Sequence, residues 1–283
     1  MKKKITLVKR RQVFSRALIY TLLIVVLSFI FLAPVIWTFM TSLKTPKDAF
    51  ALPPKWNFSP KWDNYPKAWL SKDFAKSFYN TTIIGLATVA LTLALTIPMA
   101  YALVRYKFRG SQALGIWLIG AYLLPEMLFM IPLFTIYNIL GLYDTKLGLI
   151  LAFQIFNLPY SVWLLKGFIA QIPRSIEEAA LVDGCSELGI LWRITLPLIG
   201  PGLSATAILA FITIWVELLI PLSLSYTNAS TVAISIANFK GYGAFNWPLM
   251  AAACIVAIMP QMAFFLIAQK YIVSGLTLGA VKG

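Results

Sequence analysis

Carboxylate and amide side chains inside apolar segments are the residues of this sequence with the most evident chemistry. Glu126 and Glu217 interrupt two long apolar runs, Gln154 and Asn157 lie in a third, and Trp215 stands two positions before Glu217. An ionisable residue in a membrane-spanning segment is a functional-site hypothesis by default, because it is costly to keep there. Carboxylates and amides can form hydrogen bonds with a polar solute and an aromatic ring can stack on one, so these five residues are candidates for lining a substrate pathway. The alternative is a structural role in interhelical hydrogen bonding and packing.

Composition argues against several other chemistries. The 283 residues include no histidine and two cysteines, Cys185 and Cys254, which form no C-x-x-C pair. Ser-His and Cys-His nucleophile pairs are therefore absent, and a zinc site would need an unusual ligand set. The G-x-x-x-x-G-K-[ST] loop that cradles nucleotide phosphates is also absent. We therefore expect no catalytic residues, no metal and no cofactor, and any ATP must be bound by another chain.

Apolar runs long enough to cross a bilayer dominate the chain. It is 60% apolar and only 12% charged, whereas a soluble domain carries about 25% charged residues. A spanning helix needs about 20 apolar residues. The segments that qualify are 17–40, 81–104, 113–140, 147–165, 199–225 and 249–269. The third is overlong and interrupted by Pro125 and Pro132. We expect an all-α integral membrane protein with six transmembrane helices in a single domain, 17–273.

Basic residues decide the expected orientation of these spans. The net charge is +14, and seven of the Lys and Arg residues lie in the segment 1–16, before the first span. Arg105, Lys107 and Arg109 follow the second span. The positive-inside rule therefore places both termini in the cytoplasm, including a tail at 274–283. These clusters suit anionic lipid headgroups and lack the aromatic pattern of a nucleic-acid surface.

The number of lysines in the first external segment opposes this orientation. The segment 43–80 would be external, yet it holds seven lysines. We interpret it as a small external lobe that is translocated despite its charge. The segment 226–247 would also be external, either as a loop that faces a binding protein or as a plain connector.

Residues 171–200, cytoplasmic in this topology, are the most informative segment. Ser175 followed by Glu178 predicts a capping box that starts a short helix. Gly184 suits the left-handed position that ends it, Ser186 can cap a second helix, and Pro197 closes the unit. The apolar residues expected to be displayed there are Ala179, Ala180, Leu181, Val182, Leu191 and Trp192. Exposed apolar surface on a rigid element indicates a protein interface. The alternative is an amphipathic connector on the membrane surface.

The spacing of this segment resembles the EAA motif of ABC importer permeases. The motif residues at the motif spacing are Glu178, Ala179, Ala180, Gly184, Ile194, Leu196 and Pro197. Further matches resemble the carbohydrate-importer, MalG-like branch of these permeases. They are "RYKFRG" at 105–110, "LLPE" at 123–126, "GLYDTKLGLIL" at 141–151 and the ending "QKYIVSGLTLGAVKG" at 269–283. The resemblance covers nearly the whole chain from the first span.

The resemblance implies a six-helix permease that couples to separate ATPase subunits. Its implied partners are a second permease, two cytoplasmic ABC ATPase subunits, an external solute-binding protein and membrane lipid. The coupling residues it implies are Glu178, Ala179, Ala180, Asp183, Gly184, Ile194, Leu196 and Pro197. Glu178 would pair with a basic residue of the ATPase, and Gly184 would give the bend between the helices. One departure is Val216, where this branch often has Asn between Trp and Glu.

The expected function is therefore import of a sugar, oligosaccharide or related solute by alternating access, in a bacterial or archaeal cytoplasmic membrane. A secondary transporter driven by an ion gradient is the main alternative, although it would need a buried ion-coupling cluster and usually more spans or internal repeats. A non-transporting membrane scaffold for an ATPase is a second alternative.

Overall fold

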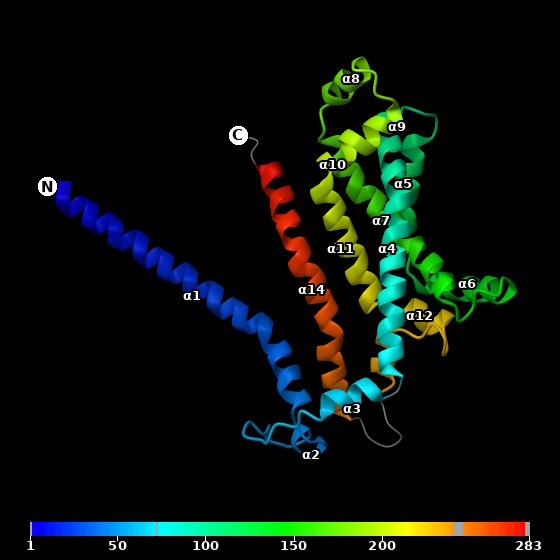
Figure 1. The fold of residues 1–283 in the computed structure, drawn as a ribbon. Coiled ribbons are helices and arrows are strands. Elements are labelled where there is room, and N and C mark those ends of the chain that lie inside the picture. Colours follow the sequence, from blue (N-terminus) through cyan, green and yellow to red (C-terminus); the bar gives the residue numbers. More distant parts are fainter. Residues whose placement is uncertain (1, 72, 240–245, 281–283) are drawn as a thin grey trace. The chain divides into compact units, whose positions relative to one another are not determined.

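Helices make up the regular structure wherever the structure describes the chain. The computed structural model describes residues 2–71, 73–239 and 246–280, and their side chains over 17–71, 73–239 and 246–267. Within these ranges every element is a helix (Figure 1). The predicted all-α fold class is confirmed. Residues 240–245 of the loop at 226–247, and 281–283 of the tail at 274–283, lie outside the described residues.

The chain divides into two compact units. One comprises residues 1–68 and 241–256, and the other comprises 69–240 and 257–283. Helix α14 (Trp247–Ala280) contributes to both units.

The first unit is built on the long helix α1 (Lys2–Ser42). Every large apolar side chain from Leu18 to Phe39 is at least 41% exposed. A helix that is apolar all round is stable in lipid, since so large an exposed apolar surface would drive association in water. α1 is therefore a membrane-spanning helix by composition and by exposure.

A small lobe follows α1 in the same unit. Helix α2 (Pro46–Ala49) begins at the cap residue Thr45, whose hydroxyl accepts a hydrogen bond from the Asp48 N–H. Asn64, at the start of α3 (Asn64–Leu70), donates to the Ser42 and Lys44 carbonyls at 2.7 and 3.0 Å. These bonds satisfy the last carbonyls of α1 and fix the lobe to its end.

Helices α4 (Phe74–Arg105) and α7 (Lys146–Ala170) form the centre of the second unit. Small side chains on α4 recur every fourth residue, where a helix repeats its face, and all are 0% exposed: Thr88, Thr92, Thr96 and Ala100. Such small residues let neighbouring backbones approach closely. Helices α5 (Ser111–Tyr122) and α11 (Gly200–Val216) pack around this pair (Figure 1), and α13 (Val232–Ala237) packs against α4.

The segment expected as one span at 113–140 is broken. Helix α5 ends at Tyr122, α6 (Met127–Ile139) begins four residues after Leu123, and their axes meet at 95°. Pro125 lies in the break, because proline cannot donate the backbone hydrogen bond that would continue α5. Pro132 lies within α6 and does not end it. Figure 1 shows α6 leaving the direction of α5 sharply.

The segment expected as the fifth span, 199–225, also contains more than one helix. Helix α11 ends at Val216, and α12 (Leu219–Leu224) follows after two residues. Among the described residues, four helices are long and apolar enough to span a membrane. The number rises to six if each of two bent pairs counts as one span, Ser111–Tyr122 with Met127–Ile139 and Glu187–Leu198 with Gly200–Val216.

Two other boundaries differ from the expected ones. Helix α4 already begins at Phe74, so the end of the lobe expected at 43–80 is helical and continuous with the second span. Helix α14 continues to Ala280, beyond the expected end of the last span at 269. Polar residues such as Lys76 and Asn80 end the apolar run and so set the expected start of the span at residue 81. They are nevertheless compatible with a helix, and α4 continues through them outside the hydrocarbon core.

Candidate functional site

Residues 171–200, which we call the EAA loop, start with a helix that has no side-chain cap. Helix α8 (Arg174–Val182) follows Pro173, and no side chain bonds its first amides. The predicted capping box of Ser175 and Glu178 is therefore wrong. Ser175 lies inside the first turn, and a cap residue must lie just outside the helix with non-helical dihedral angles. Pro173 instead sets the start, because its restricted backbone precedes the helix.

Gly184 ends α8 as predicted. Its φ is +83°, in the left-handed region that glycine adopts without a steric penalty. The Gly184 N–H donates to the Leu181 carbonyl at 3.0 Å, and the Cys185 N–H donates to the Ala180 carbonyl at 2.9 Å. This pair of bonds is the Schellman motif, which satisfies the last carbonyls of a helix.

The second half of the EAA loop begins at Ser186. Its hydroxyl accepts a hydrogen bond from the Gly189 N–H at 3.2 Å, which confirms the predicted cap of α9 (Glu187–Ile190). A π-helical turn, η1 (Leu191–Thr195), follows directly and leads into α10 (Leu196–Leu198). Pro197 lies in α10, and α11 begins at Gly200.

The EAA loop presents one face outward and one inward. The outward side chains are exposed and include Glu178, Ala179, Leu181, Val182, Asp183, Leu188 and Trp192. The inward side chains are buried and include Glu177, Ala180, Ile190, Leu191 and Thr195. The expectation that Ala180 and Leu191 are displayed is therefore wrong. Ala180 lies one helical turn after Glu177 and shares its inward face, and the chain's own helices cover both residues.

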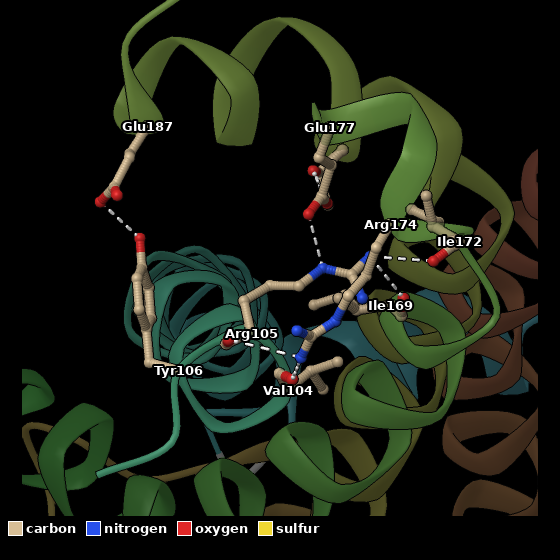
Figure 2. Close-up of polar contacts among 9 residues, drawn as sticks. Val104, Arg105, Tyr106, Ile169, Ile172, Arg174, Glu177 and Glu187 are labelled. Atoms are coloured by element: carbon tan, nitrogen blue, oxygen red, sulfur yellow. Dashed lines mark hydrogen bonds and ion pairs between the residues drawn. The ribbon is translucent and has the colours of Figure 1, made fainter. Parts of the chain in front are cut away.

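A buried ion pair anchors the inward face. Arg105, the last residue of α4, places its Nε 2.7 Å from Oε2 of Glu177, and the two side chains are 8% and 10% exposed. The Thr195 hydroxyl donates to Oε1 of Glu177 at 3.0 Å. The Arg105 Nη2 also donates to the Ile169 and Ile172 carbonyls, both at 3.1 Å. Figure 2 shows the guanidinium between Glu177 and these carbonyls.

Two exposed contacts flank this ion pair (Figure 2). Arg174 Nη2 donates to the Val104 carbonyl at 3.3 Å, at the end of α4. The Tyr106 hydroxyl donates to Oε2 of Glu187 at 2.7 Å. That hydrogen bond, with a smaller effect of burial, raises the pKa of Tyr106 to about 12.

Sequence reasoning missed Glu177 and the partner role of Arg105. From the sequence, Arg105 is interpreted as a cytoplasmic charge that sets topology and as part of the matching segment 105–110, and no partner is predicted for it. A local signal did exist, because Glu177 and Ala180 are three residues apart on one helical face while Glu178 lies on another. The pairing with Arg105, 72 positions earlier in the sequence, has no local signal.

A cavity of about 260 Å³ brings together three of the predicted pathway residues. Glu126, Asn157 and Glu217 line it. The remaining lining residues are aromatic, apolar or hydroxyl-bearing: Tyr122, Phe153, Phe156, Tyr160, Leu209, Ile212, Thr213, Ile214 and Ile220. No Lys or Arg is among the lining residues, all of which are described by the structure. Over 17–71, 73–239 and 246–267, no three His, Cys, Asp or Glu side chains gather to hold a metal ion.

Breaks in the helices position both glutamates. Glu126 lies between α5 and α6, in the 95° bend. Glu217 follows α11 with extended dihedral angles, and its Oε1 accepts the Leu219 N–H at 2.7 Å. Asn157 is 8% exposed and donates from Nδ2 to the Phe153 carbonyl of its own helix at 2.9 Å. The cavity thus presents carboxylate and amide groups beside the rings of Tyr122 and Tyr160.

The other two predicted pathway residues do not line this cavity. Gln154 accepts from the Thr92 hydroxyl at 2.9 Å and donates to the Thr88 carbonyl at 3.3 Å, which joins α7 to α4. Trp215 is 3% exposed and donates from Nε1 to the Ala257 carbonyl at 2.9 Å. Both side chains serve helix packing in this structure.

Asp144 organises the loop 225–231 between α12 and α13. Its carboxylate accepts the N–H groups of Tyr226, Thr227, Asn228 and Ala229 at 2.9 to 3.2 Å. Burial raises the pKa of Asp144, but these four hydrogen bonds together outweigh it and lower the pKa to about 2. No sequence pattern singled out this residue.

Comparisons with known proteins show the family of the chain. Residues 92–278 match the family described as "Binding-protein-dependent transport system inner membrane component". The trehalose transport system permease protein SugB of Mycobacterium tuberculosis is 40% identical over 262 residues, covering 89% of this chain and 93% of SugB. The sulfoquinovosyl glycerol transport system permease protein SmoH of Agrobacterium fabrum is 34% identical over 254 residues, covering 89% of each chain.

The fold also matches solved structures. One is a bacterial ABC transporter involved in the import of the acidic polysaccharide alginate. A chain of that structure superposes with a TM-score of 0.74 at 22% identity, covering 90% of this chain and 95% of that chain.

Proposed function

The chain belongs to the family of inner-membrane components of binding-protein-dependent transport systems, and from that premise we propose that it is one of two permease subunits of an ATP-driven sugar importer. It is a multi-pass inner-membrane transport component, and the hydrolysis of ATP belongs to separate partner subunits. The proposed partners are a second permease, two cytoplasmic ATPase subunits and an external solute-binding protein. Both termini are proposed to face the cytoplasm.

The observation that carries this proposal is the outward face of the EAA loop. Val182 is 88% exposed, Leu188 is 70% exposed and Trp192 is 55% exposed, on short helices that are held from the inward side by the contacts of Glu177. Exposed apolar side chains on a rigid support suit a protein partner. Glu178 lies on the same face, where it can pair with a basic residue of the ATPase. Ala179 and Asp183 complete this face, while Gly184, Ile194, Leu196 and Pro197 shape its backbone.

The deciding experiment is uptake into proteoliposomes that contain this chain and its proposed partners. Uptake is expected to require ATP on the ATPase side and the binding protein on the other side. Uptake driven by an ion gradient without ATP would instead support a secondary transporter. ATP hydrolysis without any uptake of the solute held by the binding protein would support a scaffold.

The cavity lined by Glu126, Asn157 and Glu217 is proposed as part of the substrate pathway. Sugar hydroxyls can donate to the carboxylates, and sugar rings can pack against Tyr122 and Tyr160. Two acids without a cation among the lining residues repel an anion, so the favoured solute is a neutral sugar. SugB, a trehalose transport permease, supports a neutral sugar, whereas SmoH, a permease for sulfoquinovosyl glycerol, does not.

Replacement of the two acids tests this pathway. Glu126→Gln and Glu217→Gln are each expected to raise the KM for uptake by about tenfold, because a hydrogen bond to a charged group contributes about 1.5–3 kcal/mol. Asp63→Asn, which removes an acid outside the cavity, is the matched control and is expected to leave KM unchanged. An unchanged KM in both cavity variants would exclude the cavity from the pathway and leave the importer assignment intact.

A further inference from the structure

Two adjacent glutamates of the EAA loop have opposite surroundings. Glu178 is exposed on the outward face, whereas Glu177 is 7% exposed and ion-paired with Arg105. We propose that Glu177 and Arg105 form a positioning pair, which fastens the EAA loop to the transmembrane helices so that movement of a docked ATPase is transmitted to them. This inference rests on the proposed function, since it assumes an ATPase on the outward face.

Arg105 joins three parts of the second unit at one buried point. It is the last residue of α4, it pairs with Glu177 of α8, and it donates to the carbonyl of Ile169 in the last turn of α7 and to that of Ile172 in the following linker. A guanidinium has five donors in a rigid fork, so a single Arg can make all these contacts together. Figure 2 shows that these partners converge on one side chain.

Glu177 extends the connection to the other half of the loop. Its second carboxylate oxygen accepts the hydroxyl of Thr195, which is 0% exposed and ends the π-helical turn η1. Through α10, η1 leads directly into α11. One carboxylate therefore connects α8 and the start of α11 to the same arginine.

The burial of this pair makes the loss of either partner costly. Removing one partner of a buried ion pair leaves an uncompensated charge, which is far more destabilising than the loss of an exposed pair. The covalent link between α7 and α8 is short, since only Gln171, Ile172 and Pro173 separate the two helices. Without the ion pair, rotation of the backbone dihedrals of Gln171 and Ile172 can absorb part of a displacement of α8, whereas the φ of Pro173 is fixed.

The two glutamates therefore have separate tasks. Glu178 contacts the ATPase, while Glu177 transfers the resulting displacement to α4, α7 and α11. Rigid-body movement of the EAA loop with these helices is one of the known ways in which a local push becomes a large conformational change. Loss of Glu177 is expected to uncouple hydrolysis from uptake, and loss of Glu178 is expected to weaken docking.

The test uses the full complex of permeases, ATPase and binding protein in proteoliposomes. Glu177→Gln is expected to retain the ATPase on purification and to hydrolyse ATP, with solute transported per ATP reduced by about tenfold, within the usual range of site-to-site coupling. Glu178→Gln, at the neighbouring position, is the matched control. It is expected to lower ATPase co-purification while the complexes that do form transport the wild-type amount per ATP.

A charge exchange separates positioning from simple loss of folding. The double variant Arg105→Glu with Glu177→Arg keeps both charges in the site and is expected to recover part of the transport per ATP. Recovery is partial, because the carbonyls of Ile169 and Ile172 lose their donor. If Glu177→Gln does not insert, this double variant tests the positioning role in its place.

Three results would overturn the inference. They are wild-type transport per ATP in Glu177→Gln, loss of the ATPase from inserted Glu177→Gln, and a charge exchange that recovers neither insertion nor coupling. Failure of the proposed function looks different, because the wild-type complex itself would then import without ATP or not at all.

Discussion

At the scale of single residues, the left-handed backbone of Gly184 decides where the second half of the EAA loop begins. A Cβ at this position would meet no atom within 4 Å, so space does not demand glycine there. The φ of +83° does demand glycine, since placing an L-residue in the left-handed region costs about 1–2 kcal/mol of conformational free energy. The requirement is for backbone conformation alone.

Gly184→Ala is therefore expected to lower ATPase co-purification and uptake through a strained loop, while the protein still inserts. Gly184→Asn is expected to lose less, because asparagine tolerates this conformation better. Gly167→Ala in α7 is the control, since it also meets nothing within 4 Å and has helical dihedrals. Equal uptake by Gly184→Ala and the control would contradict this account.

Asp144 makes the stability of the folded protein depend on pH, with stability lost in acid. Its pKa is lowered from 3.8 to about 2 in the folded protein by four backbone N–H groups. A lowered folded pKa contributes stability that is present above the unfolded value and is lost as the pH falls through the folded one. The contribution of Asp144 is therefore constant at neutral pH and disappears between about pH 4 and pH 2.

Asp144→Asn is expected to lower the thermal unfolding midpoint of the detergent-solubilised protein at neutral pH, because the amide cannot accept all four N–H groups. The difference from the wild type should shrink as the pH drops from about 4 to about 2. A difference that stays constant across that range would show that the charge of Asp144 does not stabilise the loop.

The site residues that could be predicted are those with a local pattern. Gly184 and the Ser186 cap follow from short-range backbone rules, and both are found where expected. The capping box at Ser175 satisfied the same kind of rule and is wrong, since Pro173 already fixes the start of the helix. Glu177 was missed because its importance comes from Arg105, which only the folded chain brings near.

At the scale of elements, apolar length predicted the existence of helices better than their continuity. The run 113–140 carries no charged residue apart from Glu126, yet it bends by 95° at residues 123–126. Hydropathy carries no information on direction, whereas Pro125 provides a break that the sequence did reveal. The break before α12 has no such signal, because Glu217 and Leu218 are both compatible with a helix.

Close helix packing makes another prediction at this scale. Gly202 of α11 packs against Phe168 of α7, and a Cβ at Gly202 would lie 2.5 Å from Cγ of Phe168. Gly202→Ala is expected to destabilise the protein by about 1–3 kcal/mol through overpacking. Adding Phe168→Ala should make the double variant more stable than the sum of the two changes predicts, by about 0.5–3 kcal/mol.

The measurement is chemical or thermal unfolding of the four proteins of this double-mutant cycle. Gly120→Ala in α5 is the matched control, since its Cβ would meet nothing within 4 Å. Strict additivity of the two changes would show that α7 and α11 do not approach each other closely at these residues.

At the scale of the whole molecule, the fold class and the family followed from the sequence, because both depend on features spread along the chain. Long apolar runs predicted an all-helical membrane protein, and the EAA spacing predicted a permease. Contacts such as Arg105 with Glu177, or Asp144 with residues 226–229, could not be predicted in this way. They join distant segments, and a single sequence shows no relation between them.

The proposed orientation can be tested with the natural cysteines. Cys185 lies in the EAA loop, half-buried and outside the predicted spans, and Cys254 lies in α14. In a Cys254→Ala variant, a membrane-impermeant maleimide is expected to label Cys185 in inverted vesicles and not in right-side-out vesicles. A bound ATPase should reduce that labelling. Labelling from the outside of intact cells would reverse the proposed topology.

The opposite orientations of Glu177 and Glu178 also bear on how such a subunit can be adapted to a different ATPase. Residues that face the partner, such as Glu178, Val182 and Trp192, are distinct from the residues that secure the loop to its own chain, Glu177 and Thr195. The residues that face the partner can thus be substituted while the buried contacts of Glu177 and Thr195 stay intact. Transplanting only that set between permeases should create matched, mutually exclusive pairs of transporter and ATPase for engineered cells.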